Sequence, residues 1–282
     1  MPHKNLLNIL NPNRPTEIVD IGANPVDGEP PYRPMLAGKH LCHVTGFEPQ
    51  PEALNILLAK KGANERYLPY AIGNGSPQTL NICQESGMSS LLSPDQNMLK
   101  TFGLFAEFGK VISQVPVITR TLDSIDEIVH LDYLKIDIQG GELAVFKNGR
   151  QKLSNTVVIQ TEVSFMPLYE NQPTLGEIDI ELRSQGFVPH CFAAIKNWII
   201  SPMVINANPR IPLNQLLEAD MVYVRDFTKP DGLSDEQLKH LALISHICYK
   251  SFDLALRCVV LLEQRGVLPK GSADQYPKMI SG

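Results

Sequence analysis

The side chains in this 282-residue sequence with the greatest capacity for chemistry are carboxylates at the ends of short apolar segments. Asp20 stands near the end of the first segment, just before Gly22, where a sharp turn favours a residue without a Cβ atom. At such a turn a ligand can lie against main-chain N–H groups. The carboxyl end of a buried strand is also where open parallel α/β sheets bind ligands. We therefore expect a ligand-binding loop that begins at Asp20.

Glu48 ends the next apolar segment and is followed by Pro49. A carboxylate in this position can accept hydrogen bonds from both hydroxyls of a ribose, as in dinucleotide-binding folds. The alternative is a solvated acidic residue that only precedes a proline. The glycine pattern G-x-G-x-x-G is absent, and this disfavours an NAD-dependent oxidoreductase.

Three further carboxylates follow later apolar segments. Asp137 ends the strongest buried-strand pattern of the chain, and Gln139-Gly140-Gly141 permits a tight turn beside it. Glu142 follows that turn, where it can act as a base or stabilise the first turn of the next helix. Glu162 lies near the end of a fifth buried segment, so it should face the same edge of the sheet.

Apolar segments alternate with helical patterns through most of the chain, which predicts a mainly parallel sheet with helices on both faces. The expected strands are 16–21, 43–47, 66–72, 79–83, 111–119, 131–138, 157–163, 187–194 and 221–225. The expected helices are 33–38, 49–61, 95–110, one that begins near 119, 143–148 and 175–185.

The two ends of the chain differ from this pattern. Residues 1–15 form a lead-in, and we expect one domain over 16–229 and a helical appendage over 230–282. A capping signal at Ser234 and Gln237 begins the dense apolar helical pattern of the appendage. This segment is too short to hold a core of its own, so it must pack on the sheet or on another subunit. We expect this helical segment to form an oligomer contact or to act as a lid over the site where the substrate (the acceptor) binds.

Bulk composition excludes several classes of function. A formal net charge of −5 and dispersed basic residues provide no footprint for nucleic acid or an anionic membrane. Five cysteines without a C-x-x-C pair argue against a disulfide framework or a zinc site, and no metal-ligand spacing is evident. The first residues do not form a signal peptide, and no apolar run could span a bilayer, so we expect a cytoplasmic protein.

Five motifs occur in an order that resembles the FkbM-type family of S-adenosylmethionine-dependent methyltransferases. They are V-D-I-G-A-N at 19–24, G-F-E-P at 46–49, T-L-D-S-I at 121–125, L-K-I-D-I-Q-G-G-E at 134–142 and V-V-I-Q-T-E-V at 157–163. The resemblance covers about residues 16–226. It implies the Rossmann-like class I methyltransferase fold, an α/β fold with a seven-stranded, mostly parallel sheet and one reversed strand. It also implies transfer of a methyl group from S-adenosylmethionine to a hydroxyl of a small molecule, sugar, glycan or secondary metabolite.

The resemblance also implies a set of site residues. Asp20, Gly22 and Asn24 would hold the methionine part of the cofactor, and Glu48 would hold its ribose. Ala71 and Ile72 would form an apolar shelf for adenine; the alternative is that they are two ordinary core residues. Ser90 would belong to a polar loop near the cofactor, or else to a simple turn. Asp137 would bind the ammonium group of the cofactor or act as the base, Glu142 is the second candidate base, and Glu162 would bind acceptor hydroxyls.

The loop after Asn24 departs from the family pattern. Val26 stands where the family has glycine, and a proline-rich stretch follows it, with Gly28 two residues late. The turn around the methionine part must therefore have a different shape. This departure motivates an alternative from another class, a non-catalytic methyltransferase-fold module that acts through its C-terminal helices.

Overall fold

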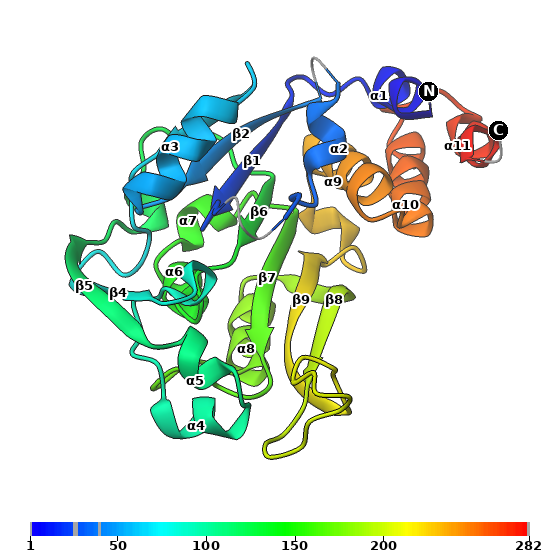
Figure 1. The fold of residues 1–282 in the computed structure, drawn as a ribbon. Coiled ribbons are helices and arrows are strands. Elements are labelled where there is room, and N and C mark those ends of the chain that lie inside the picture. Colours follow the sequence, from blue (N-terminus) through cyan, green and yellow to red (C-terminus); the bar gives the residue numbers. More distant parts are fainter. Residues whose placement is uncertain (1, 25–27, 39–40, 281–282) are drawn as a thin grey trace.

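The computed structural model describes residues 2–24, 28–38 and 41–280, with side chains from Leu6 onward, and it is built around a seven-stranded sheet (Figure 1). In chain order the strands of this sheet are β1 (Thr16–Ile21), β2 (Cys42–Phe47), β3 (Glu65–Leu68), β6 (Tyr133–Ile136), β7 (Val158–Ser164), β8 (Phe187–Trp198) and β9 (Gln215–Arg225). Their spatial order is β3-β2-β1-β6-β7-β9-β8, and β9 runs antiparallel to both of its neighbours. The predicted mostly parallel sheet with one reversed strand is confirmed.

Helices cover both faces of this sheet. In chain order the helices are α1 (Pro2–Leu10), α2 (Arg33–Leu36), α3 (Pro51–Lys60), α4 (Gln96–Thr101), α5 (Phe105–Phe108), α6 (Glu142–Lys147), α7 (Arg150–Leu153), α8 (Leu175–Ser184), α9 (Asp235–Cys248), α10 (Phe252–Gln264) and α11 (Ser272–Ile280), of which α4 and α5 lie away from the sheet faces (Figure 1). A separate two-stranded antiparallel sheet pairs β4 (Pro77–Cys83) with β5 (Val111–Ile118) and lies beside the central sheet (Figure 1). Short 3₁₀ turns lie at Ser86–Met88, Leu122–Ser124 and Pro230–Gly232.

Alternation along the strands separates two large apolar clusters, one on each face of the sheet, and a third, smaller cluster lies around α4 and β4. Ile18 and Val158 belong to the cluster beneath α1, α2, α9 and α10, whereas Val19 and Ile159 belong to the cluster beneath α6 and α8. The C-terminal helices therefore pack on the sheet of their own chain, next to α1 (Figure 1). The expected cap of α9 is present, since Ser234 and Gln237 form a reciprocal capping box.

The structure corrects several of the predicted elements. Residues 95–110 form two short helices, because Gly103 interrupts them with a positive φ of 64°. The helix expected near 119 is only the 3₁₀ turn at Leu122–Ser124, because the backbone of Arg120 instead bonds to Ala71 and Gly73. β3 ends at Leu68, and α11 was not predicted; it is short and contains Pro277.

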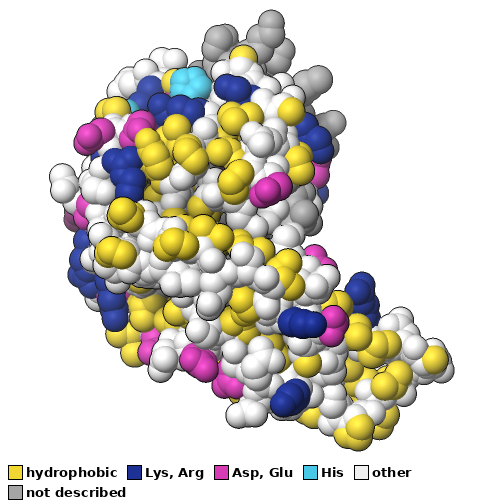
Figure 2. Space-filling view, turned by 60° about the vertical axis from the view of Figure 1, so that its left-hand side comes forward, with side chains coloured by type: hydrophobic (Ala, Val, Ile, Leu, Met, Phe, Trp, Pro, Cys, Tyr) yellow, Lys and Arg dark blue, Asp and Glu magenta, His cyan; other side chains and the backbone are white. Residues whose placement is uncertain are grey.

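The surface carries no extensive patch of a single charge on the face shown in Figure 2, where basic and acidic side chains are interspersed. Within the described part of the chain, none of the helices combines the length and the apolar character that a bilayer crossing needs.

Candidate active site

A cleft opens at the carboxyl ends of β1, β2 and β6 and holds about 640 Å³ of empty volume, part of it open to solvent. Parallel strands bring their carboxyl ends to the same edge, so residues far apart in sequence meet there. Seven of the predicted site residues line the cleft, namely Gly22, Asn24, Glu48, Ala71, Ile72, Ser90 and Asp137. Asp20, Glu142 and Glu162 are not part of its lining.

The turn after β1 has a steric cause that the sequence alone did not show. Gly22 has a φ of +77°, and a Cβ atom there would lie 1.9 Å from the backbone oxygen of Asp137. The N–H groups of Gly22 and Ala23 both donate to the carbonyl of Phe47, at 3.0 and 3.2 Å. Contrary to expectation, these two N–H groups are therefore occupied by the neighbouring strand and are not available to a ligand.

One wall of the cleft combines a buried carboxylate with apolar surface. Glu48 is 2% exposed, and its Oε1 accepts the backbone N–H of Gln50 at 2.8 Å. Phe47 and Tyr70 stack with ring centroids 6.1 Å apart. Ala71 and Ile72 continue this wall in a loop that is held by the backbone of Arg120. The arrangement can accept the hydroxyls of a ribose beside a shelf for a flat ring.

Asp20 points away from the cleft. Its Oδ2 accepts a hydrogen bond from the Tyr32 hydroxyl at 2.6 Å, and its Oδ1 lies 3.5 Å from Nζ of Lys135. Asp20 faces the α2 side of the sheet, like Ile18 two positions before it. The structure therefore places Asp20 in a neighbouring cavity and not beside Gly22 and Asn24 in the cleft.

The turn after β6 is organised by Gln139, which the sequence analysis did not select. Its φ is +56°, unusual for a residue with a Cβ atom, and Gly140 follows with +102°. Its Nε2 donates to Asp137 at 2.9 Å and to Glu162 at 3.0 Å. Ser90 Oγ donates to its backbone oxygen at 2.7 Å. A non-glycine residue before two glycines was the only signal available in the sequence.

Glu142 and Glu162 are buried near Asp137, and the three carboxylates have oxygens within 4.8 Å of one another. Oε1 of Glu142 accepts the N–H groups of Ile138 and Gly140, at 2.9 and 3.2 Å. Burial raises the pKa of Glu142 to about 7. Burial, and after it the charge of Asp137, raises the pKa of Glu162 well above its ordinary range. Glu142 thus holds the backbone of the turn, while Glu162 lies between Gln139 and Lys196.

A second cavity lies against the cleft on the α2 side of the sheet and holds about 1350 Å³ of empty volume, part of it open to solvent. The two cavities share Asn24 and Asp137. Asp20, Lys135, Gln160 and Asp220 line its inner end. Asp137 is the one carboxylate among the described residues that lines both cavities, so it stands where two bound molecules would meet.

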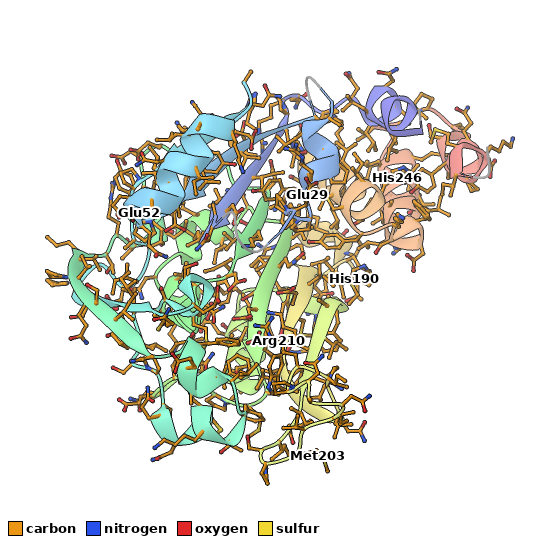
Figure 3. The ribbon with its side chains drawn as sticks, viewed as in Figure 1. Glu29, Glu52, His190, Met203, Arg210 and His246 are labelled. Atoms are coloured by element: carbon orange, nitrogen blue, oxygen red, sulfur yellow. The ribbon has the colours of Figure 1, made fainter. Side chains whose placement is uncertain are left out.

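Two further side chains, those of His190 and Trp198, make structural contacts. His190 lies beside the C-terminal helices, where its Nε2 is 2.7 Å from the Ser251 hydroxyl (Figure 3). Trp198 donates to the carbonyl of Phe102 at 3.0 Å and packs on Phe105. The departure at Val26 lies outside the described residues. Pro30 and Pro31 line the second cavity and leave the cleft open.

No curated protein matches the sequence. Magnesium protoporphyrin IX methyltransferase from Synechocystis PCC 6803, solved with bound SAM, is 9% identical, with 79% of each chain covered and a TM-score of 0.35. TYW2 of M. jannaschii, solved with AdoMet, is 10% identical, with 79% of this chain and 74% of that one covered and a TM-score of 0.35. A SAM-dependent methyltransferase from Aquifex aeolicus is 9% identical, with 79% of this chain and 89% of that one covered and a TM-score of 0.33.

The family comparison covers more than half of the sequence. The model of the methyltransferase FkbM domain matches residues 20–189, which include β1, the cleft and the turn after β6. The chain therefore belongs to the FkbM family of methyltransferases, whose methyl donor is S-adenosylmethionine.

Proposed function

We propose that the protein transfers the methyl group of S-adenosylmethionine to a hydroxyl oxygen of a small molecule, sugar or secondary metabolite. The observation that carries the proposal is the cleft itself, with buried Glu48 beside an apolar wall at the carboxyl ends of parallel strands. Glu48 accepts the ribose hydroxyls, and Ala71 and Ile72 lie against the adenine. Gly22, Asn24 and Ser90 surround the amino-acid end.

Asp137 is the group that we place at the point of transfer. The sulfonium is already an activated donor, so the protein must mainly hold the acceptor in line and remove its hydroxyl proton. Asp137 lines the cleft and the second cavity, and its Oδ1 is held by Gln139. We assign it the role of the base that accepts the hydroxyl proton. Glu162 lines neither cavity and accepts a hydrogen bond from Gln139 at 3.0 Å, so it supports the turn that positions Asp137. Glu142 is occupied by two backbone N–H groups and shapes the turn.

Cofactor binding is tested by calorimetry with S-adenosylhomocysteine. Glu48→Gln should weaken binding about tenfold, because the amide presents one acceptor oxygen and no charge to the two ribose hydroxyls. Glu52→Gln is the matched control, since Glu52 lies on the exposed surface of α3 (Figure 3). Equal losses in the two variants, or no binding by the wild type, would reject the assignment of the cleft.

The reaction is tested by incubation with ¹³C-methyl-labelled S-adenosylmethionine and the small-molecule fraction of a cell extract. The ¹³C shift of the transferred methyl group distinguishes oxygen from nitrogen or sulfur as the acceptor atom. Asp137→Asn should lower turnover about a hundredfold while S-adenosylhomocysteine still binds. A strong loss of S-adenosylhomocysteine binding in this variant would instead assign Asp137 to the ammonium group of the cofactor.

A further inference from the structure

The inner end of the second cavity carries an inference that rests on the proposed function and adds to it. Side chains from neighbouring strands converge there, with Lys135 on β6, Gln160 on β7 and Asp220 on β9. The cavity meets the cofactor cleft at Asn24 and Asp137. A molecule bound in it would reach the transferred methyl group from the side opposite the cofactor.

Gln160 is tied to the C-terminal helices by hydrogen bonds. It is 7% exposed, and its Oε1 accepts a hydrogen bond from the Tyr249 hydroxyl at 2.8 Å and a longer one from Tyr133 at 3.4 Å. The two tyrosine hydroxyls are also bonded to each other. Tyr249 follows directly after α9, whereas Gln160 lies at the middle of the sheet.

The tyrosines determine which way the amide of Gln160 points. Tyr133 can donate to Tyr249, and Tyr249 can donate to Oε1, so both buried hydroxyl protons find an acceptor. With the amide reversed, Nε2 would donate to Tyr249, and one of the two hydroxyl protons would have no acceptor among the described residues. Leaving a buried donor unpaired is costly. Oε1 therefore faces the tyrosines, and the –NH₂ group faces the cavity without a hydrogen-bond partner in the described chain.

The groups around this –NH₂ indicate what it can bind. Asp20, Asp137 and Asp220 offer carboxylate oxygens, and Oδ1 of Asp20 accepts no hydrogen bond from any described residue. Lys135 is the basic side chain that the strands contribute there, 3.5 Å from Asp20, and Arg33, Lys60 and Lys61 also line the cavity. A hydroxyl can donate to a carboxylate and accept from an amide at the same time. With five carboxylates and four basic side chains among its lining residues, the cavity has no excess of positive charge that would favour an anionic ligand.

We propose that Gln160 determines specificity for a neutral, polyhydroxylated methyl acceptor and that the C-terminal helices complete the acceptor site through Tyr249. Gln160 donates a hydrogen bond to an oxygen of the acceptor. Tyr249 is a positioning residue that keeps this donor turned toward the cavity. The helices thus contribute to recognition from the neighbouring part of the same sheet face, without contact with the acceptor.

The test uses the full chain and saturation-transfer NMR titrations with methyl α-D-glucopyranoside, with and without saturating S-adenosylhomocysteine. The wild type should bind this probe more tightly than the anion D-glucuronate. Gln160→Met keeps the side-chain length but removes the donor, so it should weaken probe binding about fivefold. Tyr249→Phe removes the hydroxyl that orients the Gln160 amide, so it should weaken probe binding by a smaller factor, about threefold.

Tyr276→Phe is the matched control, because it removes another buried hydroxyl of the C-terminal helices, one that bonds to His246 at 2.8 Å. It should leave probe binding unchanged, and calorimetry should show the same S-adenosylhomocysteine affinity in all three variants. The inference is overturned if the wild type does not bind the probe, if Gln160→Met binds it like the wild type, or if the two tyrosine variants behave alike. Failure of the wild type to bind S-adenosylhomocysteine would reject the proposed function instead.

Discussion

The two faces of the central sheet differ along the same four strands. On the face beneath α6 and α8, apolar side chains continue to the carboxyl ends of the parallel strands, as at Ile21, Ile136 and Val163. On the face beneath α9 and α10 they stop halfway. There the pattern changes from Ile18 to Asp20, from Tyr133 to Lys135, from Val158 to Gln160 and, on antiparallel β9, from Val222 to Asp220.

This difference explains where a cavity forms. Apolar helices can cover only apolar surface without leaving polar groups unpaired, so α9 and α10 cover the half with Ile18 and Val158. The half with Asp20, Lys135, Gln160 and Asp220, called the polar half below, stays open as the second cavity. Tyr249 marks the boundary, since its hydroxyl joins the covered residue Tyr133 to Gln160.

The largest effect is expected at the junction of β1 and β6, where backbone atoms leave no room for a side chain. Gly22→Ala should lower the free energy of unfolding by more than about 4 kcal/mol or prevent folding, since its Cβ would meet the Asp137 oxygen. Gly266→Ala has a similar φ of +73° in open space and should cost only about 1 kcal/mol in urea unfolding. Equal costs would show that backbone conformation, and not contact between the strands, requires Gly22.

The apolar half is expected to carry the stability of the C-terminal helices. Leu241 is fully buried in α9, so Leu241→Ala should lower the free energy of unfolding by about 3 kcal/mol through lost contacts and a cavity. Ile180 in α8 is 72% exposed, and Ile180→Ala should change the free energy of unfolding by less than about 0.5 kcal/mol. A cost for Leu241→Ala as small as that for Ile180→Ala would mean that the helices pack loosely on the sheet.

Glu142 should make stability depend on pH. Burial raises its pKa from 4.5 to about 7, so the folded protein retains a proton that the unfolded chain has lost. Unfolding free energy should therefore fall as pH rises from about 4.5 to about 7 and then level off, by on the order of 3 kcal/mol. Glu142→Gln should remove this component while its Oε1 still accepts the two N–H groups. Urea titrations at several pH values, with exposed Glu52→Gln as control, test the prediction; a parallel decline in Glu142→Gln would contradict it.

The smallest effect is expected in the polar half, with an unusual sign. Burial, and then the charge of Asp137, raises the pKa of Asp220, so its ionised form is disfavoured in the folded protein. Asp220→Asn should therefore raise the free energy of unfolding at pH 8, by less than about 1 kcal/mol.

Asp123→Asn provides the contrast, because Asp123 accepts the N–H groups of Gln151 and Lys152 at 3.1 and 2.8 Å. The Asp123→Asn substitution should lower the free energy of unfolding by about 1 kcal/mol. A loss of stability in both variants would remove the difference that we draw between a carboxylate kept for a ligand and one kept for the fold.

Much of the fold could be predicted because its signals are local. Short apolar segments between helical patterns located the seven strands of the sheet, and the capping pair Ser234 and Gln237 located the start of α9. The helix expected near 119 failed because Arg120 bonds to Ala71, a partner from another part of the chain. Carboxylates at strand ends likewise indicated the edge of the site but not the direction in which each one points.

The sequence by itself determined the family, the sheet and the edge at which Glu48 and Asp137 meet, because each depends on residues close together in the chain. Tertiary structure decided that Asp20 faces α2, that Phe47 takes the N–H groups of Gly22 and Ala23, and that Gln139 holds the central turn. It also placed Tyr249 against Gln160, 89 positions away. The physical reason is that a buried polar group must find its hydrogen-bond partner in space, and for these groups that partner lies on another strand or helix.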